Sequence, residues 1–186
     1  FQFAAWLGGF AHPTGYPLYL MLGWLWSHIL PFGDPAYRLN LFSALWGGAA
    51  VGLLALVVMR VLRLLGEKSQ ALVRVVGAGA GAVFIFTPTF WSQAVIAEVY
   101  TLHAVIVNAI LLSLLTWAER AWRGDDTEAR RWWYAAALLL GLGLAHHRAT
   151  LMVLLAAAFF VVVVVRARPH ITTPAAALTM AVVLAP

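Results

Sequence analysis

The chain has 186 residues, 63% of them hydrophobic and 10% charged, with a formal net charge of +5. A soluble domain could not bury so much apolar surface, so the composition predicts an integral membrane protein. The sequence contains no cysteine, which excludes disulfides, thiolate metal sites and a thiol nucleophile.

The basic residues predict how the chain crosses a bilayer. Ten of the twelve Lys and Arg residues fall in three clusters, which are Arg60, Arg63, Lys68 and Arg74, then Arg120, Arg123, Arg130 and Arg131, then Arg166 and Arg168. The apolar sequence between consecutive clusters suffices for two passes at roughly 20 residues per helix, so all three clusters can lie on one face. The positive-inside rule makes that face cytoplasmic. Because these charges flank spans instead of lining an aromatic groove, nucleic acid is excluded as a partner.

Residues 1–36 are predicted to form an outer loop and juxtamembrane helices. Two prolines within residues 12–17 interrupt a short apolar piece, and Pro17 suits the first turn of a helix. The helix that follows, as far as Leu30, is short for a span and rich in Trp and Tyr, which favours a juxtamembrane position. A short transmembrane hairpin arm is the alternative.

Residues 37–186 are predicted as spans of the same single transmembrane domain. The apolar segments cover residues 39–64, 75–86, 101–118, 132–145 and 150–165, and a sixth begins near Pro174. Thr87 should close the second segment, because the residue before a proline avoids the helical conformation. Close helix contacts are expected at small residues, namely Gly77, Gly79, Gly81, Gly141 and Gly143. The predicted fold class is all-α, a polytopic transmembrane helix bundle with juxtamembrane helices and about six spans.

The ends of the chain indicate a fragment. The sequence begins without an initiator Met, a charged signal region or a cleavage site, and it ends within an apolar run at Pro186. We therefore expect a longer parent protein.

The first candidate site on the non-cytoplasmic face is the loop at residues 12–19. Its two prolines and a glycine would hold a rigid turn that exposes His12, Tyr16 and Tyr19. The alternative is a simple helix start, which Pro and Gly commonly mark.

The second candidate site is the segment with Glu98 and His103. An acidic side chain near the bilayer centre costs about 2.5–3.5 kcal/mol, so Glu98 should face a polar cavity. On one straight helix the two residues would lie about 140° apart, so they converge only if the chain is irregular near Tyr100. The alternative is that Glu98 marks the interfacial end of a helix.

The third candidate site is the run His146, His147 and Arg148 between two apolar spans. Arg presents a planar fork that suits phosphate, and neighbouring imidazoles can add donors to the phosphate oxygens. A snorkelling Arg at a helix end is the alternative. Two adjacent histidines on a helix point about 100° apart, so a metal site is not favoured.

Four motifs in order, at residues 7–19, 38–45, 88–103 and 141–148, together resemble a bacterial membrane family named only as a domain of unknown function. That family is related to a eukaryotic O-mannosyltransferase that acts on plexin-type receptors. The resemblance covers nearly the whole chain. It implies a GT-C glycosyltransferase in the bacterial inner (plasma) membrane that takes a sugar from a polyprenyl-phosphate carrier on the non-cytoplasmic side.

The resemblance also implies roles for individual residues. An acceptor hydroxyl would attack the anomeric carbon while a carboxylate takes its proton. Arg148, with His146 and His147, would stabilise the leaving phosphate, and Arg38 is a second phosphate candidate. Glu98 and His103 would orient hydroxyls at the catalytic centre, and the His12, Tyr16 and Tyr19 loop would shape the pocket. The acidic signature of the family would fall before Phe1, so we expect the fragment alone to be inactive.

The implied partners are membrane lipid, the polyprenyl-phosphate sugar donor and a protein or glycan acceptor. No cofactor is expected, and a need for a divalent metal stays open. The rival hypotheses are a transporter or lipid-binding subunit without catalysis, in which Glu98 and the histidines line a pathway, and a purely structural bundle. The sugar and the acceptor cannot be read from these residues.

Overall fold

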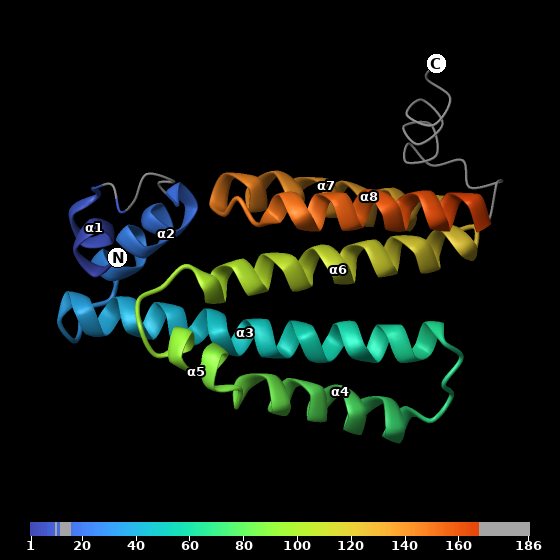
Figure 1. Cartoon of the computed structure of the whole chain (residues 1–186), viewed down its shortest axis with the longest axis horizontal. Helices are drawn as coiled ribbons and strands as arrows, with labels where there is room; N and C mark the ends of the chain where they lie inside the picture. Colours follow the sequence, from blue (N-terminus) through green and yellow to red (C-terminus); the bar gives the residue numbers. More distant parts are fainter. Residues whose placement is uncertain (10, 12–15, 168–186) are drawn as a thin grey trace, which may run out of the picture.

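The computed structural model describes residues 1–9, 11 and 16–167, and all regular secondary structure in this part is α-helical (Figure 1). The helices are α1 (Gln2–Leu7), α2 (Pro17–Ile29), α3 (Pro35–Leu64), α4 (Gln70–Ile85), α5 (Pro88–Ala94), α6 (Tyr100–Trp122), α7 (Asp126–His146) and α8 (Thr150–Ala167). The long helices lie alongside one another, and the short α1 and α2 gather at one end of them. The prediction of an all-helical bundle is confirmed.

The two ends of the bundle differ in chemistry. The α3–α4 loop, the α6–α7 loop and the C-terminus of α8 lie together (Figure 1), and we call this the basic end, because nine of the ten clustered cations lie there or in adjoining turns. Arg168 lies outside the described residues. The opposite end carries α1, α2, α5 and the junction of α6, α7 and α8, and we call it the histidine end after His103, His146 and His147.

Several helices are long and apolar enough to cross a membrane. Among the described residues α3, α6 and α8 qualify, and α4 with α5 would make a fourth span with a bend of 73°. The helix α7 begins with charged residues at the basic end but has 21 residues, a length of about 31 Å. Since α6 and α8 run the same way, α7 must bring the chain back between them. Five of the six predicted spans are therefore helices, and the sixth, near Pro174, lies outside the described residues.

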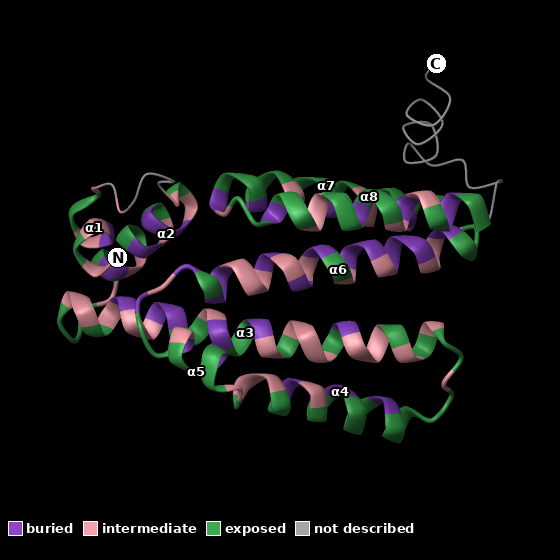
Figure 2. Ribbon diagram, in the orientation of Figure 1, coloured by how far each residue is buried: buried purple, intermediate pink, exposed green. Residues whose placement is uncertain are grey.

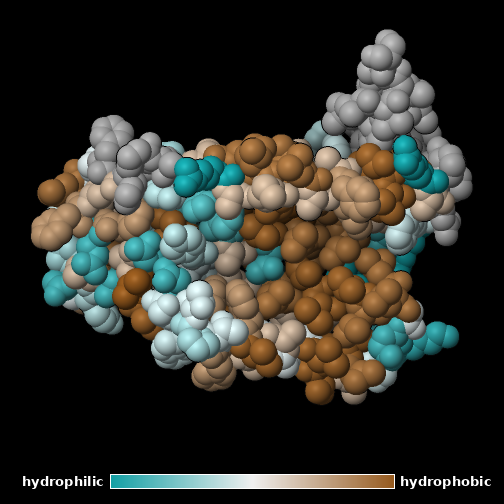
Figure 3. Space-filling view, viewed as in Figure 1, coloured by the Kyte–Doolittle hydropathy of each residue, from teal (hydrophilic) through white to brown (hydrophobic). Residues whose placement is uncertain are grey.

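The surface of the bundle matches a membrane protein. Hydrophobic residues cover the middle of the face shown in Figure 3, and hydrophilic residues gather toward the two ends. Large apolar side chains on α4 and α8 are exposed, among them Val75, Val83 and Phe159. Burial is instead concentrated along α6 (Figure 2), where Ile110 and Trp117 are fully enclosed. The chain is therefore an integral membrane protein with α6 at its centre.

Prolines set two boundaries that the sequence predicts. The helix α2 begins at Pro17, and its 13 residues make it too short to span. Thr87 is extended, with ψ 130°, and Pro88 opens α5. After α5 the chain is non-helical from residue 95 to residue 99, and α6 begins at Tyr100. The irregularity required for Glu98 and His103 to converge is thus present.

Glycines allow close packing at some of the predicted positions. A Cβ at Gly77 would lie 2.5 Å from Met59, and one at Gly143 would lie 2.7 Å from Thr150. Gly81 likewise leaves room for Val51. A Cβ at Gly79 or at Gly141 would meet no atom within 4 Å among the described residues, so packing there does not explain these two glycines.

Candidate functional site

Three imidazoles meet at the histidine end. The ring centroid of His103, in the first turn of α6, lies 4.7 Å from that of His147 and 6.1 Å from that of His146. The rings of His146 and His147 are 6.4 Å apart. The predicted histidines of the second and third candidate sites therefore form one cluster.

The end of α7 explains how adjacent histidines reach the same neighbour. His146 is the last helical residue, and His147 is extended, with φ −148° and ψ 127°. The His147 amide still donates to the Gly143 carbonyl at 2.8 Å. The expectation that the two rings would diverge on a continuous helix is thus corrected, because the helix stops between them.

The hydrogen bonds of the two rings indicate their protonation. His146 is 2% exposed, and its Nε2 lies 3.2 Å from the Val99 carbonyl, which can only accept. The proton of the neutral ring is therefore on Nε2, which leaves Nδ1 as an acceptor. For His147 the Ala149 amide donates to Nδ1 at 3.1 Å, so the proton of its neutral ring is also on Nε2.

The surroundings of His147 keep its imidazole neutral. Burial lowers the pKa of His147, and the positive charge of Arg148 lowers this pKa further. The neutral ring then offers one N–H donor, at Nε2, while Nδ1 is already engaged.

Several buried polar atoms near the cluster have no partner among the described residues. They are His103 Nδ1, His146 Nδ1, Thr101 Oγ1 and Thr150 Oγ1. Thr101 and Thr150 are fully buried. Because buried polar groups in proteins are nearly always hydrogen-bonded, such a concentration at the junction of α6, α7 and α8 indicates a place for water or for polar groups of a ligand.

Two tyrosines border the histidine cluster. Tyr16 lies 5.4 Å from the His147 ring and 6.4 Å from the His146 ring, measured between centroids. Its backbone is left-handed, with φ 42°, which is uncommon for a bulky residue and is typical of strained positions at functional sites. The ring centroid of Tyr100 lies 5.9 Å from that of His147.

Tyr19 belongs to the core instead of the cluster. It is fully buried, and its hydroxyl lies 3.0 Å from Ser43 Oγ. Burial raises the pKa of Tyr19 to about 12, so the hydroxyl remains protonated at physiological pH. The predicted contact of Tyr19 with substrate stays a prediction, and His12 lies outside the described residues.

Glu98 lies in the non-helical segment just before α6 and is partly buried. Its backbone N–H and its backbone carbonyl each lie 3.2 Å from Ser43 Oγ. Its carboxylate forms no ion pair within the described part of the chain. Asp34, which precedes α3, is different, because it caps that helix by accepting from the Tyr37 amide at 2.7 Å.

Arg38 and Arg148 differ in how far the fold uses them. The Arg38 guanidinium donates to the Ser27 carbonyl at 2.7 Å and to the Phe32 and Gly33 carbonyls at 3.0 Å, so it satisfies the C-terminal end of α2 and the following turn. Arg148 is exposed and has no ion-pair partner among the residues that the structure describes. Arg148 is thus the cation at this end that is free for a ligand.

An apolar cavity of about 460 Å³ lies between α6, α7 and α8. Its lining runs from Leu144 and Leu154 near the histidine end to Trp133 and Val162 farther along the helices. Small residues such as Ala137 and Ala158 face it from α7 and α8. A second recess of about 470 Å³ lies at the α4–α5 bend and is lined by residues that include Phe90 and Tyr100.

No group of three or more metal-ligating side chains among the described residues is arranged to hold a metal ion.

No pattern in the sequence identifies Ser43, Thr101, Tyr100 or Thr150 as residues of the histidine end. A single hydroxyl within an apolar segment has no spacing that reveals its partners. The one available hint is Gly47, one turn after Ser43, which indicates a close approach on that face of α3.

Comparison with known proteins gives a consistent result. Residues 1–172 match the family described as the Protein O-mannosyl-transferase TMEM260 N-terminal domain. Protein O-mannosyl-transferase TMEM260 of Mus musculus is 34% identical over 111 residues, which are 60% of this chain and 14% of the mouse protein. The protein of the same name from Dictyostelium discoideum is 30% identical over 114 residues, 60% of this chain and 13% of its own length. The chain thus spans a small part of these relatives, and no solved structure matches it.

Proposed function

The chain belongs to the family of Protein O-mannosyl-transferase TMEM260 N-terminal domains, and we propose that it forms the donor-binding part of a GT-C-type membrane glycosyltransferase. The donor is a polyprenyl-phosphate-linked sugar, and the acceptor is a hydroxyl of a protein or glycan. The observation that carries the proposal is the position of the histidine cluster, which Arg148 follows in the chain, beside the end of an apolar cavity between α6, α7 and α8.

Arg148 and His147 would bind the phosphate of the donor. A guanidinium can place two parallel N–H groups on a phosphate, and His147 Nε2–H adds a neutral donor beside it. Both residues follow α7 directly, so the site lies at the level where a headgroup meets the hydrocarbon core. The relatives named as O-mannosyltransferases support mannose as the sugar.

The apolar cavity would hold the first isoprene units of the carrier. Leu144 lines the cavity at the histidine end and lies two positions before His146. An isoprenoid chain in the cavity could therefore present its phosphate to Arg148 without crossing polar surface. Apolar packing against the lining needs no directional bonds, which suits a flexible polyprenyl chain.

In the proposed reaction the acceptor oxygen bonds to the anomeric carbon, and the bond from that carbon to the carrier phosphate breaks. The phosphate leaves with the bonding electrons and is stabilised by Arg148 and His147. A carboxylate takes the proton of the acceptor hydroxyl. Glu98 and His103 would orient sugar or acceptor hydroxyls.

The test is turnover by the full-length parent protein. It would be purified in detergent and given a polyprenyl-phosphate mannose, and mass spectrometry would follow loss of the donor and release of the carrier phosphate in the presence of an acceptor peptide. Release above a no-protein control supports transfer. Binding of the donor without release, at saturating acceptor, would favour the alternative of a lipid-binding subunit or transporter, which the apolar cavity also suits.

A further inference from the structure

We propose that Ser43 is the positioning residue for Glu98: a single buried hydroxyl on α3 fixes both backbone polar groups of Glu98 and ties them, through Tyr19, to the juxtamembrane helix α2. The inference rests on the proposed function to the extent that Glu98 acts on substrate. In this proposal the apolar helix α3 contributes to the edge of the candidate site.

The contacts at Ser43 are unusually complete for one hydroxyl. Ser43 is fully buried, and its Oγ lies 3.2 Å from the Glu98 nitrogen, 3.2 Å from the Glu98 carbonyl oxygen and 3.0 Å from the Tyr19 hydroxyl. These partners are 55 and 24 residues away in the sequence. One side chain therefore joins α2, α3 and the segment before α6.

The directions of these three bonds follow from the chemistry of a hydroxyl, which has one donor and two acceptor lone pairs. The Glu98 carbonyl can only accept, so the Ser43 O–H donates to it. The Glu98 N–H and the Tyr19 O–H must then both donate to Ser43. With the pKa of Tyr19 at about 12, its proton is available for this bond at any physiological pH. Every donor and acceptor of Ser43 is thereby used.

The segment needs such a partner because it is not helical. Residues 95–99 lie between α5 and α6, so the backbone groups of Glu98 have no helical bonds, and a buried backbone group without a partner is strongly disfavoured. The same face of α3 carries Gly47 one turn later, where a Cβ would lie 3.1 Å from the Cβ of Ala94. Residues 94–98 thus pack against the face of α3 that carries Ser43 and Gly47.

Fixing the backbone of Glu98 also restricts where its carboxylate can lie. Besides burial, the negative charge of Glu98 raises the pKa of Tyr19. A general base or hydroxyl-orienting group requires this kind of fixed placement, because a misplacement of about 1 Å can cost about 100-fold in rate.

The test uses the full-length protein with four variants. Ser43→Ala removes the hydroxyl, Ser43→Cys keeps similar volume with only a weak donor, and Tyr19→Phe removes one of the three bonds while the ring stays. Ser113→Ala is the control, because Ser113 is a buried serine on α6 at 3% exposure that takes no part in these contacts. Two quantities are measured, which are hydrogen exchange of residues 95–99 and the kcat and KM for the donor.

We expect exchange at the Glu98 amide to accelerate in Ser43→Ala, and kcat to fall by about 100-fold with the KM for the donor little changed. Ser43→Cys and Tyr19→Phe should show smaller losses, and Ser113→Ala should behave as wild type. If Ser43→Ala leaves exchange unchanged, or accelerates it with normal kcat, the positioning role is overturned. A wild-type protein that protects the Glu98 amide but never transfers a sugar would instead reject the proposed function and leave the hydrogen-bond arrangement standing.

Discussion

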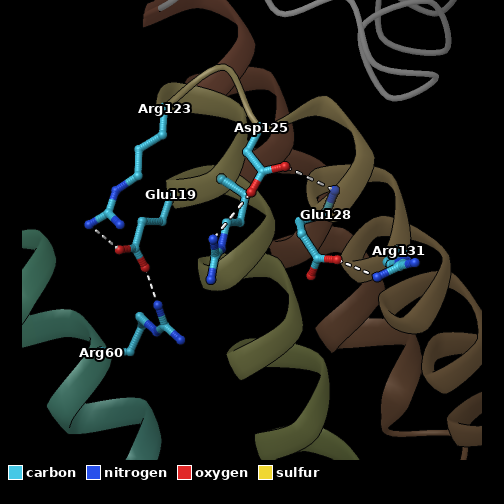
Figure 4. A network of polar contacts seen from close by, with 7 residues as sticks. Arg60, Glu119, Arg123, Asp125, Glu128 and Arg131 are labelled. Atoms are coloured by element: carbon cyan, nitrogen blue, oxygen red, sulfur yellow. Dashed lines mark hydrogen bonds and ion pairs between the residues drawn. The ribbon is translucent and has the colours of Figure 1, made fainter.

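The two ends of the bundle differ in how far their polar groups are paired within the protein. At the basic end, Glu119 accepts from Arg60 and, at 2.7 Å, from Arg123, while Arg120 pairs with Asp125 and Arg131 with Glu128 (Figure 4). At the histidine end, His103, His146, Thr101 and Thr150 each keep a buried polar atom without a partner among the described residues, whereas toward the basic end this holds for Arg120 Nε and Trp117 Nε1. Arg148 is exposed there without an ion pair in the same part of the chain.

The charges at the basic end are largely paired within the protein, whereas the histidine end leaves buried polar groups that a ligand could pair. Ion pairs between α3 and α6 and within the α6–α7 loop hold the helices in register, and they use their charges in doing so. Unsatisfied buried groups are costly, so a cluster of them is retained where another molecule supplies the missing bonds. We therefore assign stability mainly to the basic end and chemistry to the histidine end.

The largest difference expected between the two ends is that they face different compartments. Single cysteines at Ser69 and Asp126 on the basic end, and at Gln93 and Asp34 on the histidine end, can be placed in this cysteine-free sequence. With an impermeant thiol reagent on intact cells, only the Gln93 and Asp34 variants should label. Labelling of the Asp126 variant without permeabilisation would contradict the proposed orientation.

The next largest effect is expected at Arg148. In the full-length protein Arg148→Lys should lower donor turnover by about 100- to 1000-fold while expression is kept, because a point charge cannot reproduce the two parallel N–H groups of the guanidinium. Arg130→Lys, an exposed arginine at the basic end, is the matched control and should be neutral. Equal activity of the two variants would remove Arg148 from the phosphate site.

Substitution of Glu119 should have the reverse effect, because it should lower stability without lowering turnover. Its side chain is 14% exposed and is shared by two arginines, one of them on α3. Glu119→Gln should lower the free energy of unfolding by about 1–3 kcal/mol, because two cations lose their partner. Thermal unfolding measures this loss, and turnover per folded molecule should stay within twofold of wild type. A large fall in kcat with an unchanged unfolding midpoint would reverse the roles of the two ends.

A smaller effect is expected from pH at the histidine end. Because burial and Arg148 lower the pKa of His147 in the folded protein, the neutral ring contributes stability that is full above the usual value of 6.5. That stability is lost as the pH falls through the lower folded value, when protonation of Nδ1 breaks the bond from the Ala149 amide. His147→Gln should therefore show a weaker drop in unfolding midpoint between about pH 7.5 and pH 5.5 than wild type. An unchanged drop would show that His147 is not the group concerned.

Much of the fold could be predicted from the sequence because single residues determine its boundaries. Pro17 and Pro88 cannot sit inside a helix, so helices begin at both. The spacing of the basic clusters likewise predicts which loops share an end. These features are local, or depend on a period that a bilayer imposes.

The candidate site could be predicted only in part, because its geometry depends on contacts between distant segments. The histidines were identifiable as polar residues between apolar spans, but their convergence requires α7 to end at His146. Ser43 could not be identified, since its partner Glu98 is 55 residues away. The engagement of Arg38 with the carbonyls after α2 was also not predictable, because it depends on how the turn at residues 30–34 folds.

The most direct test of the account is to find where the donor lies. A polyprenyl-phosphate mannose with a diazirine on its first isoprene units would be photo-crosslinked to the full-length protein in detergent, and the labelled peptides would be identified by mass spectrometry. We expect labelling of α7 and α8 around the cavity, at positions such as Leu140 and Ala158, with competition by unlabelled donor. Labelling spread over the exposed apolar face of α4, around Val75 and Val83, or labelling that unlabelled donor does not reduce, would contradict it.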